Sequence, residues 1–238
     1  KKIISKLENC KIITRLGVGF DLIDIDECAV RNIPVCNVPD YGTCEVADHA
    51  LALLMSFTRG INFYNNFLSE DLLKNWDYSK VTSITRLAGK KIGILGLGRI
   101  GTAFAMRVKA LGMDVVFYDP YVVDGQEKAL NIKREKNIDR FIGAIDFLSI
   151  HCLSNNETRG IIDKHALNNS KNNLIIINTA RGDIVNIDDA YKALKDNKIF
   201  GLALDVFSKE PPDLEHPIIQ AYINKEEWLA NRFLITPH

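Results

Sequence analysis

The sequence predicts an α/β fold built on a doubly wound parallel sheet, and three observations support this prediction. From residue 91 onward, apolar strand patterns alternate with helical patterns. Several strand patterns are continuous apolar runs, such as residues 174–177, which suit strands covered on both faces. A glycine-rich turn joins the first of these strands to a helix. The chain has 238 residues, which is enough for one large or two modest domains.

The first part of the chain reads as a small strand–helix–strand fragment. We expect a strand over 11–16, a break at Gly17 and Gly19, a helix over 25–31 and a strand over 34–38. This fragment is too small to bury a core alone. A long helix is predicted over 45–59, and its stretch 50–55 is apolar on nearly every face. Such a helix must be buried, either inside the fold or against another subunit. The second alternative leads to the prediction of a homodimer, and the first remains its competitor. Residues 62–86 read as a polar connection.

The strongest signal lies at residues 96–101, where Gly-x-Gly-x-x-Gly follows a strand pattern over 92–95 and precedes a helical pattern over 102–111. Gly96 permits the tight turn, Gly98 lets the backbone approach a pyrophosphate, and Gly101 lets the helix pack closely. The helix N-terminus offers N–H groups and a positive dipole end. A second strand pattern over 115–118 ends at Asp119, close to the separation of about twenty residues that this motif requires. The pattern predicts a Rossmann-type domain that binds NAD.

Further strands are expected over 147–150, 174–178, 201–206 and 233–236, and polar residues follow them at their carboxyl ends. In open parallel α/β sheets, ligands bind outside these ends. One edge is therefore predicted to gather Gly96, Asp119, His151, Thr179, Arg181, Asp205 and His238.

Each of these side chains has an ordinary interpretation beside the functional one. Arg181 is either a surface salt-bridge partner or a guanidinium fork for a substrate carboxylate. Glu210 is either an exposed loop acid or part of the site. His151 is interpreted as lining the cofactor pocket rather than acting as an acid. The other three histidines lack comparable settings and are interpreted as structural or surface residues, namely His49, His165 and His216.

Composition excludes several classes of function. The formal net charge is zero and no basic stripe is present, so direct binding of nucleic acid is not expected. No apolar run approaches the length of a membrane span, and no signal-peptide pattern opens the chain. Five cysteines without a Cys-x-x-Cys pair are typical of buried thiols in the reducing cytoplasm, and no metal site is expected. The chain starts at Lys1 and stops directly after a strand pattern, so we expect a piece of a longer protein.

The motifs at 17–21, 95–101, 178–182, 204–212 and 236–238 together resemble the D-isomer-specific 2-hydroxyacid dehydrogenases. Residues 117–121 and 149–152 resemble the branch that includes the C-terminal-binding proteins. The resemblance implies a catalytic set of Arg181, Glu210 and His238. It also implies that residues 1–38 are part of a flavodoxin-like substrate domain, whose backbone at Val18 and Gly19 holds the substrate carboxylate. Residues 39–238 would then form the NAD-binding domain.

Motif and resemblance together nominate one set of cofactor-binding residues: Gly96, Gly98, Arg99, Ile100, Gly101, Asp119, His151, Cys152, Thr158, Thr179, Ala180 and Asp205. The function implied is an NAD-dependent oxidoreductase that interconverts a small 2-keto acid and a D-2-hydroxy acid. In reduction, Arg181 would clamp the carboxylate and His238 would donate a proton, with Glu210 favouring the charged imidazole. The alternative is an NAD(H)-sensing module that binds other proteins, because a dinucleotide fold does not by itself prove turnover.

Overall fold

The computed structural model describes residues 3–81 and 84–238, which form two compact units. The first unit ends at Val46. It contains a 3₁₀ turn, η1 (Ile4–Lys6), and two parallel strands, β1 (Ile13–Arg15) and β2 (Val35–Asn37), linked by helix α1 (Ile25–Val30). Its small core consists of Ile4, Cys28 and Ile33. The predicted strand–helix–strand order is confirmed, with each element shorter than expected.

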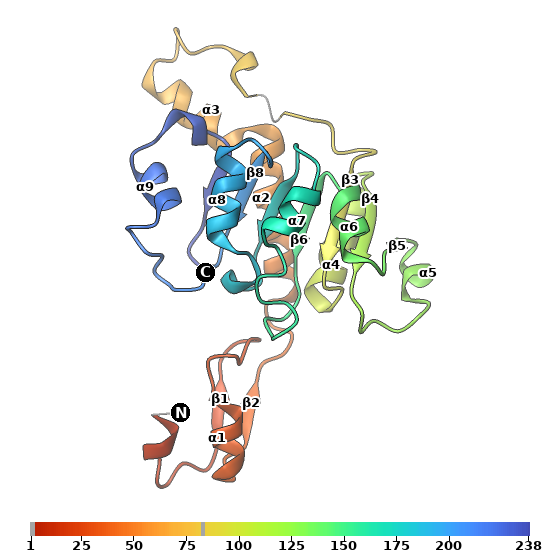
Figure 1. Ribbon diagram of the computed structural model, residues 1–238, viewed down its shortest axis with the longest axis vertical. Coiled ribbons are helices and arrows are strands. Elements are labelled where there is room, and N and C mark those ends of the chain that lie inside the picture. Colours follow the sequence, from red (N-terminus) through yellow and green to blue (C-terminus); the bar gives the residue numbers. More distant parts are fainter. Residues whose placement is uncertain (1–2, 82–83) are drawn as a thin grey trace. The chain divides into compact units, whose positions relative to one another are not determined.

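The second unit, Ala47–His238, is built on a seven-stranded sheet in the order β5-β4-β3-β6-β7-β8-β9 (Figure 1). Every neighbouring pair is parallel, so the predicted parallel sheet is confirmed. The strands are β3 (Lys91–Leu95), β4 (Asp114–Tyr118), β5 (Lys133–Arg134), β6 (Phe147–Ile150), β7 (Ile175–Asn178), β8 (Gly201–Leu204) and β9 (Phe233–Ile235). Strand β5 was not predicted, because its two residues carry no apolar pattern.

Helices cover both faces of this sheet (Figure 1). Ile175 and Ile177 pack on one face with α2 (Thr43–Arg59) and α4 (Arg99–Ala110), whereas Ile176 packs on the other. That second face is covered by α6 (Ile138–Ala144), α7 (Lys164–Asn169), α8 (Ile187–Lys195) and α9 (Pro217–Ile223). The shorter elements are α5 (Gln126–Leu130), η2 (Tyr78–Lys80), η3 (Gly182–Ile184) and η4 (Glu227–Leu229). Alternation along each strand thus divides the core into two layers.

Two expectations for residues 45–86 change in the structure. Within the chain, α2 buries one face, including Ala50, Leu54 and Phe57, and leaves Ala52 exposed. The segment read as a polar connection contains helix α3 (Ile61–Glu70), none of whose residues is buried. Its apolar residues Phe63, Tyr64, Phe67 and Leu68 recur at helical spacing and are half-buried, so the prediction of a polar connection overlooked a helical pattern. No helix in the described ranges is long and apolar enough to cross a membrane.

Candidate cofactor and catalytic site

The glycine-rich loop between β3 and α4 depends on three different properties of glycine. Gly96 has φ +92°, and a Cβ there would lie 2.6 Å from the backbone of Cys152. A Cβ on Gly101 would lie 2.1 Å from the carbonyl oxygen of Gly96. Gly98 differs, because a Cβ there would meet no atom within 4 Å. Gly98 is also the N-cap of α4 and has no side chain that could accept a hydrogen bond from the first N–H groups of the helix. The helix N-terminus, with Arg99 and Ile100 first, therefore opens onto free space that suits a pyrophosphate.

Asp119 directly follows β4, the strand beside β3, and its side chain is hydrogen-bonded to the glycine-rich loop. Its Oδ2 accepts a hydrogen bond from the N–H of Leu97 at 2.8 Å, and its Oδ1 accepts one from the N–H of Tyr121 at 2.9 Å. A carboxylate has about four lone-pair positions, so both oxygens keep capacity for ribose hydroxyls. The side chain therefore fixes the loop and remains competent to bind a ribose.

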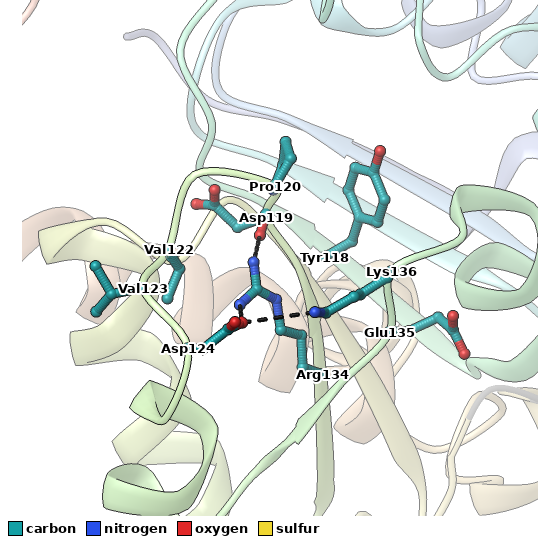
Figure 2. A pocket seen from close by; sticks show the side chains of 9 residues that line it. All are labelled: Tyr118, Asp119, Pro120, Val122, Val123, Asp124, Arg134, Glu135 and Lys136. Atoms are coloured by element: carbon teal, nitrogen blue, oxygen red, sulfur yellow. Dashed lines mark hydrogen bonds and ion pairs between the residues drawn. The ribbon is translucent and has the colours of Figure 1, made fainter.

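A cavity of about 470 Å³ lies beside Asp119, between the ends of β4 and β5 (Figure 2). Two cations line it, and both contact Asp124. Arg134, whose side chain is 9% exposed, donates to the backbone oxygen of Asp119 at 2.8 Å and to Asp124 at 3.0 Å. Lys136 lies 3.5 Å from the same Asp124 carboxylate. The cations therefore hold the Asp119 loop in place.

Near neutral pH, the ionisable side chains of His151 and Cys152, which follow β6, are uncharged. Burial lowers the pKa of His151 to about 3, and its Nε2 lies 2.8 Å from the hydroxyl of Ser149. This imidazole is neutral near pH 7, which agrees with a lining role rather than an acidic one. Burial raises the pKa of the Cys152 thiol to about 12, so the thiol stays protonated. Thr158 uses its hydroxyl within its own loop, donating to the Leu153 oxygen at 2.6 Å.

The turn after β7 presents Arg181. Buried Asn178 accepts from the N–H of Ala180 at 3.0 Å and donates to the Arg181 oxygen at 2.8 Å, which shapes the turn. A Cβ on Gly182 would lie 2.0 Å from the backbone of Phe207, so glycine lets this turn pack on the loop after β8. The motif at 178–182 is recognisable in the sequence, but no task was predicted for Asn178 or Gly182. An asparagine at a strand end is a turn signal, and this signal could have predicted the role of Asn178 in shaping the turn.

Thr179 lies in the same turn and has a buried polar atom without a partner. Its hydroxyl oxygen makes no hydrogen bond within the described ranges, although the residue is only 8% exposed. Such groups are costly to bury and are usually satisfied in proteins. The orphaned hydroxyl and the open space at Gly98 both fit a bound dinucleotide.

Glu210 and His238 meet at the carboxyl end of the sheet. His238 Nδ1 lies 2.9 Å from Glu210 Oε2, and Glu210 Oε1 accepts from the N–H of Phe207 at 3.0 Å. The carboxylate is thus anchored to its own loop, and the imidazole keeps Nε2 for another partner. Both side chains are partly exposed. An imidazole–carboxylate pair of this kind can transfer a proton.

Val18 and Gly19, the predicted substrate-carboxylate residues, belong to the first unit. Their carbonyl oxygens accept from Asn37 Nδ2 at 2.8 Å and from Arg15 Nε at 3.3 Å, respectively. These contacts hold the loop between β1 and α1. Among the residues that the structure describes, no group of three or more His, Cys, Asp and Glu is arranged to hold a metal ion.

His49 was interpreted as structural or superficial, and the structure gives it a more specific setting. Its Nε2 lies 2.9 Å from the Thr236 hydroxyl and 3.3 Å from Asp205 Oδ1. His49 comes from α2, so no local sequence pattern could link it to the ends of β8 and β9. By contrast, His165 is an exposed residue that pairs with Asp139. His216, whose side chain is 15% exposed, contacts Asp188 and caps α9 by accepting from the N–H of Ile218. The first role is superficial and the second is structural.

The fold and this site define an α/β protein that binds a nicotinamide dinucleotide. The family model described as "D-isomer specific 2-hydroxyacid dehydrogenase, NAD binding domain" matches residues 51–238. The chain belongs to this family, and the resemblance seen in its motifs is confirmed.

Three similar proteins show the range of the family. D-3-phosphoglycerate dehydrogenase of Archaeoglobus fulgidus is 36% identical over 219 residues, which cover 92% of this chain and 41% of that protein. C-terminal-binding protein 1 of Caenorhabditis elegans is 33% identical, over 92% of this chain and 31% of its own length. The crystal structure of Aquifex aeolicus D-lactate dehydrogenase with NAD and lactic acid superposes with TM-score 0.81 at 30% identity, over 100% of this chain and 72% of that one. The chain therefore spans about two fifths of the first relative's length.

Proposed function

We propose that this chain is the cofactor-binding part of an NAD-dependent dehydrogenase that interconverts a small 2-keto acid and a D-2-hydroxy acid in the cytoplasm. The observation that carries the proposal is the Glu210–His238 pair, formed at 2.9 Å at the same end of the sheet as the glycine-rich loop. The relatives named as phosphoglycerate and lactate dehydrogenases support the reaction class. A nicotinamide ring bound here would supply or accept the hydride.

The geometry of the pair assigns each nitrogen of His238 a task. Glu210 holds Nδ1, so in the neutral ring Nδ1 carries the hydrogen and Nε2 is the base. In oxidation, Nε2 takes the proton of the substrate hydroxyl. In reduction, the imidazolium returns this proton to the developing alkoxide, while the Arg181 guanidinium binds the substrate carboxylate as a two-pronged donor. Such proton transfer contributes about 10²–10⁴-fold to the rate.

The first unit completes the proposal on the substrate side. We propose that residues 1–38 are part of a substrate domain and that 39–238 form the NAD-binding domain. Within the substrate domain, the backbone at Val18 and Gly19 holds the substrate carboxylate. Support comes from the compactness of the first unit and from its parallel β1–β2 pair.

The finer cofactor proposal is NAD rather than NADP. Asp119 brings a carboxylate to the ribose position, and a carboxylate repels a 2′-phosphate. Nearby, Arg134 is held by Asp124 and by the backbone oxygen of Asp119, and Lys136 lies 3.5 Å from Asp124 (Figure 2). We expect kcat/KM to favour NADH over NADPH by more than about tenfold, as expected for one unfavourable charge contact of about 1.4 kcal/mol or more. Equal values would contradict this assignment.

The whole reaction is tested with a panel of 2-keto acids and NADH. We expect oxidation of NADH with at least one keto acid, and loss of most of this activity in Arg181→Lys. Lysine keeps the charge but lacks the planar fork. Retention of near wild-type kcat/KM in Arg181→Lys would remove Arg181 from substrate binding.

The second candidate is an NAD(H)-sensing module, which the similarity to C-terminal-binding protein 1 favours. A pure sensor has no need of a paired acid and base, so the Glu210–His238 contact supports the enzyme. Binding of NADH without oxidation by any keto acid in the panel would favour the sensor instead.

We also propose a homodimer formed through α2, α3 and the chain that follows. Four large apolar side chains in that segment are highly exposed: Leu72 at 57%, Leu73 at 91%, Trp76 at 75% and Tyr78 at 90%. Exposed apolar surface of this extent marks an association site. Light scattering should give a dimer mass at micromolar concentration, and Leu73→Glu combined with Trp76→Glu should give a monomer. A monomeric wild type would refute the dimer.

A further inference from the structure

His49 connects three elements at the carboxyl end of the sheet. It lies on α2, whereas Asp205 directly follows β8 and Thr236 directly follows β9. Its Nε2 is 2.9 Å from Thr236 Oγ1 and 3.3 Å from Asp205 Oδ1. The third side of this triangle is a hydrogen bond of 2.6 Å from the Thr236 hydroxyl to Asp205 Oδ1.

The donor directions in this triangle are fixed. Because the Thr236 hydroxyl donates to the Asp205 carboxylate, it can only accept from His49. Nε2 of His49 therefore carries a hydrogen, and this hydrogen is directed at the hydroxyl and the carboxylate together. Asp205 Oδ2 takes no hydrogen bond from the described residues, so this oxygen is available to a ligand.

The burial of the carboxylate separates this contact from an ordinary surface pair. The Asp205 side chain is 15% exposed, whereas Asp139 and Asp188, the partners of His165 and His216, are 50% and 72% exposed. A largely buried carboxylate is held firmly by its hydrogen bonds, while an exposed pair contributes little.

The strand order shows which end of a dinucleotide lies near Asp205. The glycine-rich loop follows β3 and Asp119 follows β4, so they belong to the adenosine half of the sheet. Strands β8 and β9 lie in the other half, and their loops lead on to Glu210 and His238, the proposed proton-transfer pair. Asp205 therefore lies on the nicotinamide side.

We propose that His49 is a positioning residue for the nicotinamide end of the cofactor. It holds Asp205 and Thr236 in one arrangement and so directs the free carboxylate oxygen toward the bound ring. This inference rests on the proposed function of the site. In this proposal His49 acts through Asp205 and Thr236, the two residues that it contacts.

The test compares two ligands by isothermal titration calorimetry on the protein and its variants. NADH contains the nicotinamide, whereas ADP-ribose shares the adenosine and pyrophosphate but lacks the ring. His49→Phe keeps an aromatic ring and removes the donor. We expect it to weaken NADH binding about tenfold, as loss of one hydrogen bond to a charged group predicts. Binding of ADP-ribose should change less than about twofold, which is below half of one such bond.

Two further variants separate positioning from simple destabilisation. His49→Gln retains an N–H donor and should recover most of the NADH affinity. Thr236→Val removes the acceptor and should reproduce the selective loss without altering α2. The matched control is His165→Ala, which deletes an exposed histidine–carboxylate pair and should leave both affinities unchanged.

The affinities of the wild type and the variants for the two ligands decide between a positioning role and a merely structural role of His49. Equal weakening of NADH and ADP-ribose by His49→Phe and Thr236→Val would show a merely structural contact and overturn the inference. Unchanged NADH affinity in both variants would also overturn it. A wild type that binds NADH but reduces no 2-keto acid would refute the dehydrogenase and leave the role of His49 in cofactor binding intact. A wild type that fails to bind NADH would refute both.

Discussion

Polar groups at the two ends of the parallel sheet differ in how they are hydrogen-bonded. At the amino end, Arg232 precedes β9 and donates to four backbone carbonyls, those of Leu194, Ile199, Phe200 and Trp228. At the carboxyl end, the buried hydroxyl of Thr179 has no partner among the described residues. Partial burial lowers the pKa of Arg232, yet its guanidinium stays protonated and keeps all its donors.

Asp146 is a second polar group at the amino end whose hydrogen-bonding atoms have partners. One of its oxygens accepts from the N–H of Lys91 at 2.9 Å, and the other lies 2.8 Å from the ammonium of Lys171. These bonds tie the starts of β3 and β6 together. Polar groups at the amino end therefore stabilise the fold, while groups at the carboxyl end keep capacity for a ligand. Substitutions at the two ends should therefore change different observables.

The largest effect should come from the carboxyl end, with His238→Gln. Glutamine can hydrogen-bond a keto oxygen but cannot deliver a proton at neutral pH, so the chemical step should slow by about 10²–10⁴-fold. NADH affinity and the free energy of unfolding should change little. Stopped-flow measurement of NADH oxidation checks the rate, and an unchanged rate would remove His238 from the mechanism.

The next largest effect should come from the amino end and should appear in stability. Arg232→Met leaves several carbonyls without donors, so the free energy of unfolding should fall by about 3 kcal/mol. NADH affinity should not change. Urea denaturation measures the first quantity. The matched control is Arg140→Met, which alters an exposed arginine on α6 and should be neutral. A loss of NADH affinity in Arg232→Met would contradict the division between the two ends.

Thr179→Val should change stability and cofactor affinity in opposite directions. Removing an unsatisfied hydroxyl should leave stability unchanged or raise it by about 1 kcal/mol, while NADH affinity should fall several-fold. The control is Thr58→Val, since the Thr58 hydroxyl is buried but donates to the Leu54 oxygen at 3.0 Å. This control should lose about 1 kcal/mol of stability and retain NADH affinity. Thermal melts and NADH titrations distinguish the two threonines.

The smallest effect concerns pH. Burial alone would raise the pKa of Asp146, but hydrogen bonds from Lys171 and from the N–H of Lys91 outweigh it, and the pKa lies below its ordinary value. The stabilisation is therefore complete above the unfolded pKa of about 3.9 and is lost as pH falls through the lower folded pKa. The stability difference between wild type and Asp146→Asn should shrink below about pH 4. A difference that stays constant down to about pH 2 would contradict this sign.

The sequence by itself determined the parallel sheet, the dinucleotide motif and the family. These follow from local signals: glycines whose spacing is imposed by a turn, apolar runs that suit covered strands, and motifs that stand in a recognisable order. The family resemblance, rather than a local pattern, nominated Glu210 and His238, which the structure brings within 2.9 Å of each other.

The tertiary structure alone decided the features that depend on contacts between distant segments. It placed His49 against Asp205 and Thr236, which lie far from α2 in sequence. It also formed β5, whose two charged residues carry no apolar pattern. The physical reason is common to these cases. A hydrogen bond between remote side chains, or an element fixed by its neighbours, leaves no periodic trace in the residues that make it.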